Sequence, residues 1–104
     1  MNQSKYIILD RDGVINHDSS AYIKTADEWI PIERSMEAIS LLTKNSYKII
    51  LISNQAGIGR GIISYSDMLN IHKKLVNTCT KYGGNIFSTY YCYDHPDVNS
   101  SHRK

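Results

Sequence analysis

The stretch "YIILDRDGVIN", Tyr6 to Asn16, ends a run of apolar residues on two carboxylates one residue apart, with a glycine directly after them. A run this apolar is typical of a strand buried on both faces of a parallel sheet. Buried strands do not normally finish in two acids unless those acids are used. We therefore expect Asp10 and Asp12 to carry chemistry at the carboxyl end of such a strand. Gly13 should allow the sharp turn that swings Asp12 back over Asp10.

The chain around this stretch alternates strand and helix patterns. A second apolar run, Lys48–Ile52, has a similar length and also ends in small polar residues. Between the two runs, apolar residues at helical spacing predict an amphipathic helix over residues 33–45. The spacing is carried by Ile32, Met36, Ile39 and Leu42. The unit is therefore β-α-β, which predicts a parallel strand pair with a right-handed crossover.

A second helix and a third strand follow. The helix should begin near Ser64, because an acid stands three residues later, and it should end at Gly83-Gly84. Its predicted inner stripe is Tyr65, Met68, Leu69, His72, Leu75, Val76 and Cys79. The segment Ile86–Cys92 is rich in aromatic and β-branched residues and is predicted to be a strand.

Length, composition and charge narrow the class of protein. With 104 residues, 41% of them apolar and 21% charged, the sequence predicts a single soluble domain. A net charge of +2 without a block of like charges gives no reason to expect a nucleic-acid partner. No apolar run approaches membrane-spanning length and no leader pattern is present, so we expect a cytoplasmic protein without a membrane partner. Cys79 and Cys92 form no evident disulfide framework, which fits a reducing compartment.

Polar clusters follow both of the first two strands, as "DRDG" and as "SNQAGIGRG". Ligands of open parallel sheets sit at the carboxyl ends of the strands. Asp10 and Asp12 could present a side chain and a second side chain or carbonyl to one Mg²⁺, which binds through few carboxylates and keeps waters. The hydroxyl, amides and backbone N–H groups of residues 53–55 suit phosphate oxygens. The two clusters together indicate phosphoryl chemistry.

The ordered pair "DRDGVIN" and "SNQAGIGRG", with a helix between, resembles the first two motifs of the haloacid dehalogenase (HAD) superfamily of phosphohydrolases. More narrowly, it is similar to the D,D-heptose 1,7-bisphosphate 7-phosphatase branch, which lies close to the histidinol-phosphatases. The resemblance runs from about Tyr6 to Lys104. It implies an α/β fold, a HAD-like Rossmannoid three-layer sandwich with a parallel sheet. Residues 1–104 would then be one HAD-like phosphatase domain, the N-terminal portion of a fold whose C-terminal strands are absent from this chain.

The resemblance implies four catalytic residues and a Mg²⁺ cofactor held by Asp10 and Asp12. Asp10 would be the nucleophile that becomes an aspartyl-phosphate. Asp12 would protonate the leaving sugar oxygen and then activate water, with its carbonyl on the metal. Ser53 would hydrogen-bond the transferring phosphoryl group, and Lys104 would steady the nucleophile and the phosphoryl oxygens.

The resemblance also implies substrate contacts from the loop after the first strand, from the second motif and from the C-terminal Arg-Lys. They are Asp18, Ser19, Ser20, Ala21, Tyr22, Ser53, Asn54, Gln55, Ala56, Arg60 and Arg103. Arg60 can equally be a surface charge. Tyr22 and Trp29 could line a sugar pocket, although aromatic packing under the loop is the simpler interpretation. His17 could touch substrate, whereas His72 is expected to be a packed core histidine.

The region after Cys92 departs from the family pattern. Related enzymes carry Cys-x-His and then Cys-x-Cys, which form a closed tetrahedral zinc site. The run "CYDHPDVNSSHRK" keeps Cys92 but has Asp94, Ser100 and His102 at the other ligand positions. Cys92, His95 (or Asp94) and His102 could still hold zinc, but we expect the zinc site to be lost.

The family's fourth motif, which adds an acid for Mg²⁺, is expected after Lys104. In the family's strand order, the strands that come with it would pair beside the first strand. The first strand would therefore be an unpaired sheet edge in this chain, and we expect self-association through that edge.

The function expected from the resemblance is Mg²⁺-dependent hydrolysis of a sugar phosphate. The first choice of substrate is D-glycero-D-manno-heptose 1,7-bisphosphate at its 7-phosphate, in the pathway to lipopolysaccharide precursors. Three alternatives stay open: a catalytically impaired, truncated remnant that binds phosphate, a histidinol-phosphate phosphatase, and a polynucleotide 3′-end phosphatase.

Overall fold

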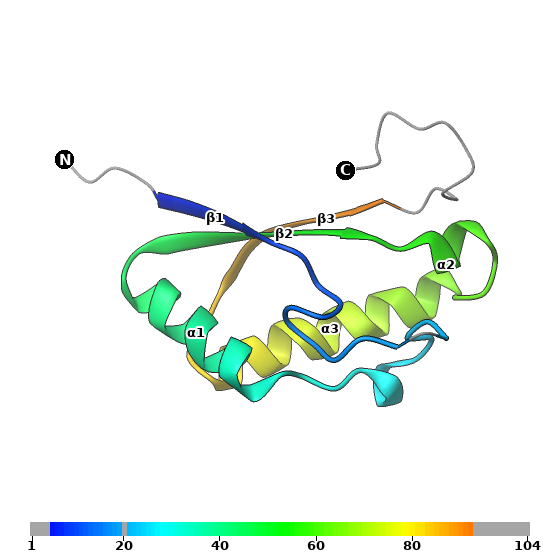
Figure 1. Cartoon of the computed structure of the whole chain (residues 1–104), viewed down its shortest axis with the longest axis horizontal. Coiled ribbons are helices and arrows are strands. Elements are labelled where there is room, and N and C mark those ends of the chain that lie inside the picture. The colour runs from blue at the N-terminus through cyan, green and yellow to red at the C-terminus, as the bar shows by residue number, and fades with distance from the viewer. Residues whose placement is uncertain (1–4, 20, 93–104) are drawn as a thin grey trace.

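The computed structural model describes residues 5–19 and 21–92. Three parallel strands form one sheet in the order β1 (Lys5–Leu9), β2 (Tyr47–Asn54) and β3 (Ile86–Cys92). Leu9 of β1 pairs with Leu51 of β2, and the β2–β3 ladder runs to the pair Asn54–Cys92. Because all three strands are parallel, their carboxyl ends lie at the same end of the sheet (Figure 1).

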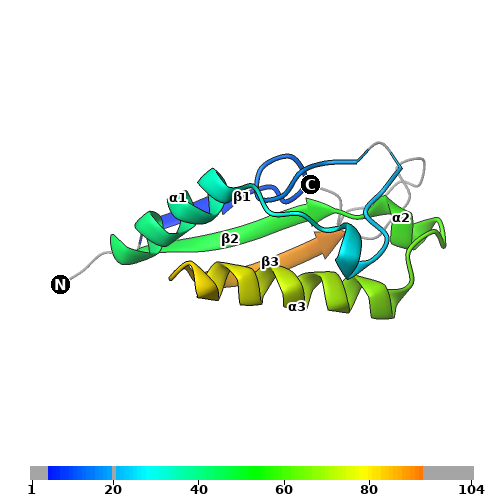
Figure 2. The ribbon, with the colours of Figure 1, turned by 90° about the horizontal axis from the view of Figure 1, so that it is seen from below.

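The helices are η1 (Ala26–Glu28), α1 (Glu33–Lys44), α2 (Ala56–Gly59) and α3 (Tyr65–Lys81). α1 and α3 lie on the same face of the sheet, and α2 follows directly at the carboxyl end of β2 (Figures 1 and 2). The α/β class with a parallel sheet is confirmed, and the predicted helix over residues 33–45 is one residue shorter in the structure. The described helices supply one of the two helical layers that the resemblance implies.

The start and the end of α3 follow from its local sequence. The side-chain oxygen of Ser64, the N-cap residue, accepts the backbone N–H of Asp67 at 3.0 Å, which satisfies one of the unpaired amides of the first turn. At the other end, the N–H of Gly84 donates to the carbonyl of Cys79 at 2.8 Å. Gly83 has φ +88°, a conformation that glycine adopts without steric cost, and it ends the helix as predicted.

The hydrophobic core lies between the sheet and the two long helices. Its fully packed members are Ile15, Ile23, Trp29, Met36, Ile39, Ile49, Leu51, Ile71, Leu75 and Cys79. Three of these residues, Ile15, Ile23 and Trp29, belong to the segment between β1 and α1. The segment that carries the first motif is therefore anchored by side chains of its own in the core.

Two expectations about burial are wrong. Tyr6 and Ile8 are 54% and 63% exposed, so β1 is covered on one face only, because α1 and α3 lie on the same side of the sheet. On α3, Tyr65 and Leu69 are also exposed, and Ile71 is buried in their place. The buried positions of α3 are Met68, Ile71, Leu75 and Cys79, which are spaced at three and four residues on one helical face.

Cys79 and Cys92 are both free and buried. Burial raises the pKa of the Cys79 thiol to about 11, so this thiol stays protonated and unreactive at neutral pH. Among residues 5–19 and 21–92, no helix is long and apolar enough to cross a membrane.

His72 connects α3 to β3. Its Nδ1 lies 2.9 Å from the Tyr91 hydroxyl, and the two rings meet edge to face at a centroid distance of 5.5 Å. The side chain is half-buried and lies outside the core, so His72 packs at the helix–sheet boundary and is not the core histidine expected from the sequence. Burial, together with the nearby positive charge of Arg11, lowers the pKa of His72 below its ordinary value of 6.5.

We predict that His72 makes the stability of the chain depend on pH. The unfolded chain takes up a proton near pH 6.5, whereas folded His72 stays neutral to lower pH, so the free energy of unfolding falls as the pH drops below about 6.5. Urea unfolding at a series of pH values should show this loss in the wild type and a flatter profile in His72→Gln. Asn77→Gln, at an exposed position of α3, serves as the control and should behave like the wild type. An equally steep profile in His72→Gln would contradict the assignment.

Candidate functional site

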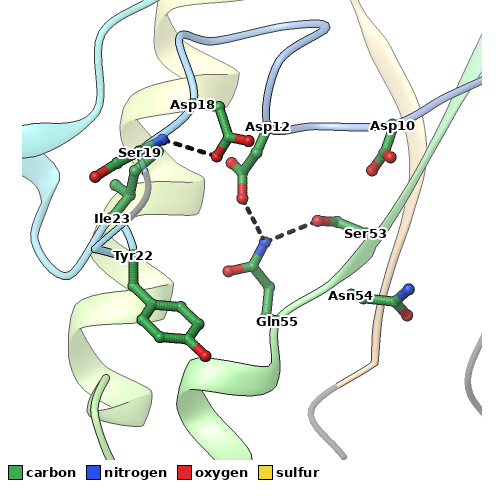
Figure 3. A pocket seen from close by; sticks show the side chains of 9 residues that line it. All are labelled: Asp10, Asp12, Asp18, Ser19, Tyr22, Ile23, Ser53, Asn54 and Gln55. Atoms are coloured by element: carbon green, nitrogen blue, oxygen red, sulfur yellow. Dashed lines mark hydrogen bonds between the residues drawn. The ribbon is translucent and has the colours of Figure 1, made fainter. Parts of the chain in front are cut away.

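A cavity of about 300 Å³ opens at the carboxyl ends of β1 and β2 (Figure 3). It is lined by Asp10, Asp12, Asp18, Ser19, Tyr22, Ile23, Ser53, Asn54 and Gln55. All of these except Ile23 are among the site residues predicted from the sequence. The structure therefore brings the first motif, the following loop and the second motif to one place.

The turn after β1 sets the positions of the two acids. Gly13 has φ +84°, in the left-handed region that favours glycine, and its N–H donates to the carbonyl of Asn16 at 2.7 Å. The N–H of Ile15 donates to the carbonyl of Arg11 at 2.8 Å. The sharp turn predicted at Gly13 is therefore present, and both acids line the same cavity. Asp10 is exposed at the strand end, and its carboxylate accepts the backbone N–H of Arg11 at 2.9 Å.

The carboxylate of Asp12 is held by three side chains. Arg11 donates from Nε to Oδ1 at 2.7 Å and from Nη2 to Oδ2 at 3.3 Å, Asn16 donates to Oδ1 at 3.0 Å, and Gln55 donates to Oδ2 at 3.2 Å. Burial by itself would raise the pKa of Asp12. The hydrogen bonds and positive charge of Arg11, with the bonds from Asn16 and Gln55, outweigh burial and lower this pKa below its ordinary value of 3.8.

Gln55 connects the first motif to the second. Its Oε1 accepts from Nη2 of Arg11 at 3.1 Å, and its Nε2 donates to Ser53 Oγ at 2.7 Å as well as to Asp12. Its backbone N–H donates to the carbonyl of Cys92, the last residue of β3, at 2.6 Å. Gln55 therefore contacts groups from the ends of all three strands.

Arg11 and Asn16 were not predicted as members of the site. Arg11 is 1% exposed and Asn16 is fully buried, although both residue types usually face solvent. The Arg11 guanidinium also lies 5.8 Å from the centre of the Tyr91 ring, within range of a cation–π contact. A lone arginine between two acids at the end of an apolar run is the signal that could have revealed its role.

Tyr22 lines the cavity and also packs against α2. Its φ is +63°, which is uncommon for a residue with a side chain. A Cβ at Gly57 would lie 3.1 Å from Cδ1 of the Tyr22 ring and 2.7 Å from Cδ1 of Ile63, so the absence of a side chain at Gly57 permits this close packing. Both interpretations of Tyr22 are therefore compatible with its position.

Trp29 is fully buried and does not line the cavity, in line with the packing role. Lys74 of α3 donates to the carbonyls of Ala26 and Trp29 at 2.7 and 2.8 Å, and its ammonium lies 5.8 Å from the centre of the Trp29 ring. This contact fixes the end of the segment that carries Asp18, Ser19 and Tyr22.

Some predicted residues are not part of the cavity lining. Ala21, Arg60 and His17 are exposed, and Ala56 is the first residue of α2. Cys92 is buried at the end of β3. Ser20, Asp94, His95, Ser100, His102, Arg103 and Lys104 lie outside the described residues. Their predicted roles, including the zinc site, stay predictions.

The oxygen atoms at the cavity suit a small hard cation. Within the described part of the chain, no group of three or more His, Cys, Asp and Glu side chains could hold a metal ion. Both carboxylate oxygens of Asp12 already accept N–H donors, which leaves the Asp10 carboxylate and backbone carbonyls as ligands. A set of few oxygen ligands completed by water fits Mg²⁺, so the residues present are compatible with the expected cofactor.

Known proteins resemble this chain in sequence. The chain is 41% identical over 96 residues to a D-glycero-beta-D-manno-heptose-1,7-bisphosphate 7-phosphatase of Neisseria meningitidis serogroup A and 42% identical over 100 residues to that of Pseudomonas putida. These alignments cover 92% and 96% of this chain but 51% and 57% of the relatives. The chain thus spans about half the length of the curated relatives it matches.

A solved structure has a closely similar fold. The D,D-heptose 1,7-bisphosphate phosphatase from B. bronchiseptica, complexed with magnesium and phosphate, superposes with a TM-score of 0.93 at 39% identity. The superposition covers 96% of this chain and 56% of that one. The resemblance to HAD phosphatases predicted from the two motifs is confirmed. The family model described as "Polynucleotide kinase 3 phosphatase" matches residues 5–104, and the chain therefore belongs to this phosphatase family.

Proposed function

We propose that this chain provides the nucleophile and phosphate-binding part of a Mg²⁺-dependent phosphatase that hydrolyses a sugar phosphate. The proposed substrate is D-glycero-D-manno-heptose 1,7-bisphosphate, attacked at its 7-phosphate. One observation carries the proposal: two acids that follow β1 and a hydroxyl near the carboxyl end of β2, that of Ser53, line a single cavity. The names of the relatives support the choice of substrate.

The first half of the proposed reaction transfers the phosphoryl group to the protein. An oxygen of Asp10 attacks phosphorus, and the bond between phosphorus and the sugar oxygen breaks. The sugar oxygen leaves with a proton supplied by Asp12. Ser53 donates a hydrogen bond to a phosphoryl oxygen, and Asn54, Asp18 and Tyr22 line the space next to it.

The second half releases phosphate. Asp12 takes a proton from water, the water oxygen attacks phosphorus, and the bond to Asp10 breaks to give phosphate and free Asp10. When bound, Mg²⁺ would neutralise charge on the phosphoryl oxygens, with the Asp10 carboxylate and the Asp12 carbonyl as its proposed ligands. Lys104 and Arg103 are proposed to contact phosphate and substrate.

A polynucleotide 3′-end phosphatase is the second candidate, because the matching family model carries that description. The net charge of +2 offers little attraction for a nucleic-acid backbone, which favours the sugar phosphate. Phosphate release from heptose bisphosphate and from a 3′-phosphorylated oligonucleotide, measured side by side, distinguishes the two substrates.

Three further proposals concern the chain as a whole. We propose that residues 1–104 form one HAD-like domain, because the helices and the sheet of residues 5–19 and 21–92 share a single core. We also propose a cytoplasmic location, supported by two free cysteines. The third is that the chain binds neither nucleic acid nor membrane as a partner.

Asp10→Asn should abolish Mg²⁺-dependent phosphate release. An amide cannot form the phosphoryl bond and lacks the charge that the metal requires, so turnover should fall by at least about a thousandfold. The measurement is release of inorganic phosphate from heptose bisphosphate by the wild type and the variant. Asp27→Asn, an exposed acid of η1, is the control and should keep wild-type turnover. More than a trace of turnover in Asp10→Asn would remove Asp10 as the nucleophile.

We propose that this chain lacks the complete set of four zinc ligands and therefore does not hold zinc tightly. With Asp94, Ser100 and His102 at three of the four ligand positions, purified protein should contain much less than one zinc per chain and should not change on mild chelation. Elemental analysis makes the measurement. One tightly held zinc per chain would contradict this and would point to Cys92, His95 and His102.

We propose that the chain self-associates through the edge of the sheet at β1. In the described part of the chain β1 pairs only with β2, and Tyr6 and Ile8 are exposed on its open face. Sedimentation should show species larger than a monomer, and Ile8→Lys should shift them toward the monomer. Leu41→Lys, at an equally exposed apolar position of α1, is the matched control and should leave the distribution of species unchanged. A monomeric wild type would contradict the proposal.

A further inference from the structure

We propose that Gln55 is a positioning residue that fixes the direction of the Ser53 hydroxyl, so that its hydrogen is presented to a phosphoryl oxygen in the cavity. Arg11 fixes the orientation of the Gln55 amide. This inference rests on the proposed function and deepens it, because it assigns Gln55 a role through Ser53 in place of direct contact with substrate.

The orientation of the Gln55 amide follows from its neighbours. A guanidinium can only donate hydrogen bonds, so the amide atom 3.1 Å from Nη2 of Arg11 must be the oxygen. The amide nitrogen is then the atom that faces Asp12 at 3.2 Å and Ser53 at 2.7 Å. The same orientation follows from Asp12, because an ionised carboxylate can only accept. Two independent neighbours therefore require the same arrangement.

The orientation of the amide limits what Ser53 can do. A serine hydroxyl has one hydrogen to donate and two lone pairs that accept. The Gln55 amide nitrogen cannot accept a hydrogen bond, so Ser53 accepts from it and must direct its own hydrogen to another acceptor. Ser53 is 2% exposed and lines the cavity (Figure 3). A phosphoryl oxygen bound in the cavity is an acceptor in the right place.

The Gln55 amide has no hydrogen left to donate to the substrate. Its oxygen accepts from Arg11, and the two hydrogens of its nitrogen are used by Asp12 and Ser53. The residue is also 5% exposed. A hydroxyl directed in advance loses little freedom when phosphate binds, and a hydrogen bond to a charged acceptor is stronger than one between neutral groups.

The test is a double-mutant cycle between Gln55 and Ser53, read out as the Kd of inorganic phosphate in the presence of Mg²⁺ by calorimetry. Gln55→Met keeps the length and removes both amide functions. Gln55→Glu keeps the acceptor toward Arg11 but cannot donate to Ser53 when it is ionised. Asn77→Met, at an exposed amide position of α3, is the control. Circular dichroism verifies that each variant is folded.

We expect Ser53→Ala to weaken phosphate binding about tenfold in the wild type, the loss of one hydrogen bond to a charged group. In the Gln55→Met background the same substitution should cost less than about threefold, because the hydroxyl is no longer directed. Should Gln55→Met not fold, the same comparison is made with Gln55→Glu. Asn77→Met should leave both values unchanged.

Three outcomes distinguish the inference about Gln55 from the proposed function on which it rests. A reduced effect of Ser53→Ala in the Gln55 variants supports the inference, because a purely structural role of Gln55 would leave that effect unchanged. An equal loss in both backgrounds contradicts the inference and leaves the proposed function intact. Failure of the wild type to bind phosphate contradicts the proposed phosphate site itself and the inference with it.

Discussion

The ion pair between the buried Arg11 and the partly exposed Asp12 is the contact on which the rest of the site depends. Its Nε–Oδ1 distance is 2.7 Å, and Arg11 is almost completely inaccessible to solvent. Removing Asp12 would leave the buried Arg11 guanidinium without its counter-charge, and for a fully buried pair such a loss costs roughly 3–5 kcal/mol. Asn16 and Gln55 stabilise the pair further, because they donate hydrogen bonds to the two carboxylate oxygens of Asp12. Through Gln55, the same network reaches Ser53 and the end of β3.

The hydrogen bonds around Asp12 affect its two proposed roles as acid and base. The contacts that orient Asp12 also lower its pKa, so they favour the ionised carboxylate. An ionised carboxylate suits the step in which Asp12 takes a proton from water. The preceding step needs a proton on Asp12, and that proton must be gained against the charge of Arg11. The contacts around Asp12 thus stabilise its ionised form, which can act as a base, and they hold its carboxylate in one orientation.

Local patterns predicted most of the fold, because they depend on periodicity and turn chemistry. The strand before Asp10, the cap at Ser64 and the turn at Gly13 each follow from a few neighbouring residues. Burial was harder to predict: Tyr6 and Ile8 are as apolar as core residues, yet they are exposed where no described element covers the sheet. The rotation of α3, which buries Ile71 and exposes Leu69, depends on tertiary packing.

The candidate site was predicted in its acids and in its second motif, but not in the contacts that hold them. The hydrogen bond between Arg11 and Gln55 joins residues 44 positions apart, so no local sequence pattern predicts it. The role of Asn16 is equally hidden, because an asparagine after a glycine turn is ordinary in sequence. Prediction from the motifs identified residues that line one cavity. It failed where buried side chains of different elements satisfy one another.

The most direct test is a crystal structure of the chain with Mg²⁺ and beryllium trifluoride, which mimics a phosphoryl group attached to a carboxylate. With Asp10 as the nucleophile, we expect beryllium bonded to an Asp10 oxygen, Ser53 Oγ about 3 Å from a fluorine, and Gln55 Nε2 still hydrogen-bonded to Ser53 Oγ. Beryllium trifluoride bound to Asp12, or absent from the cavity, would contradict the claim that Asp10 receives the phosphoryl group.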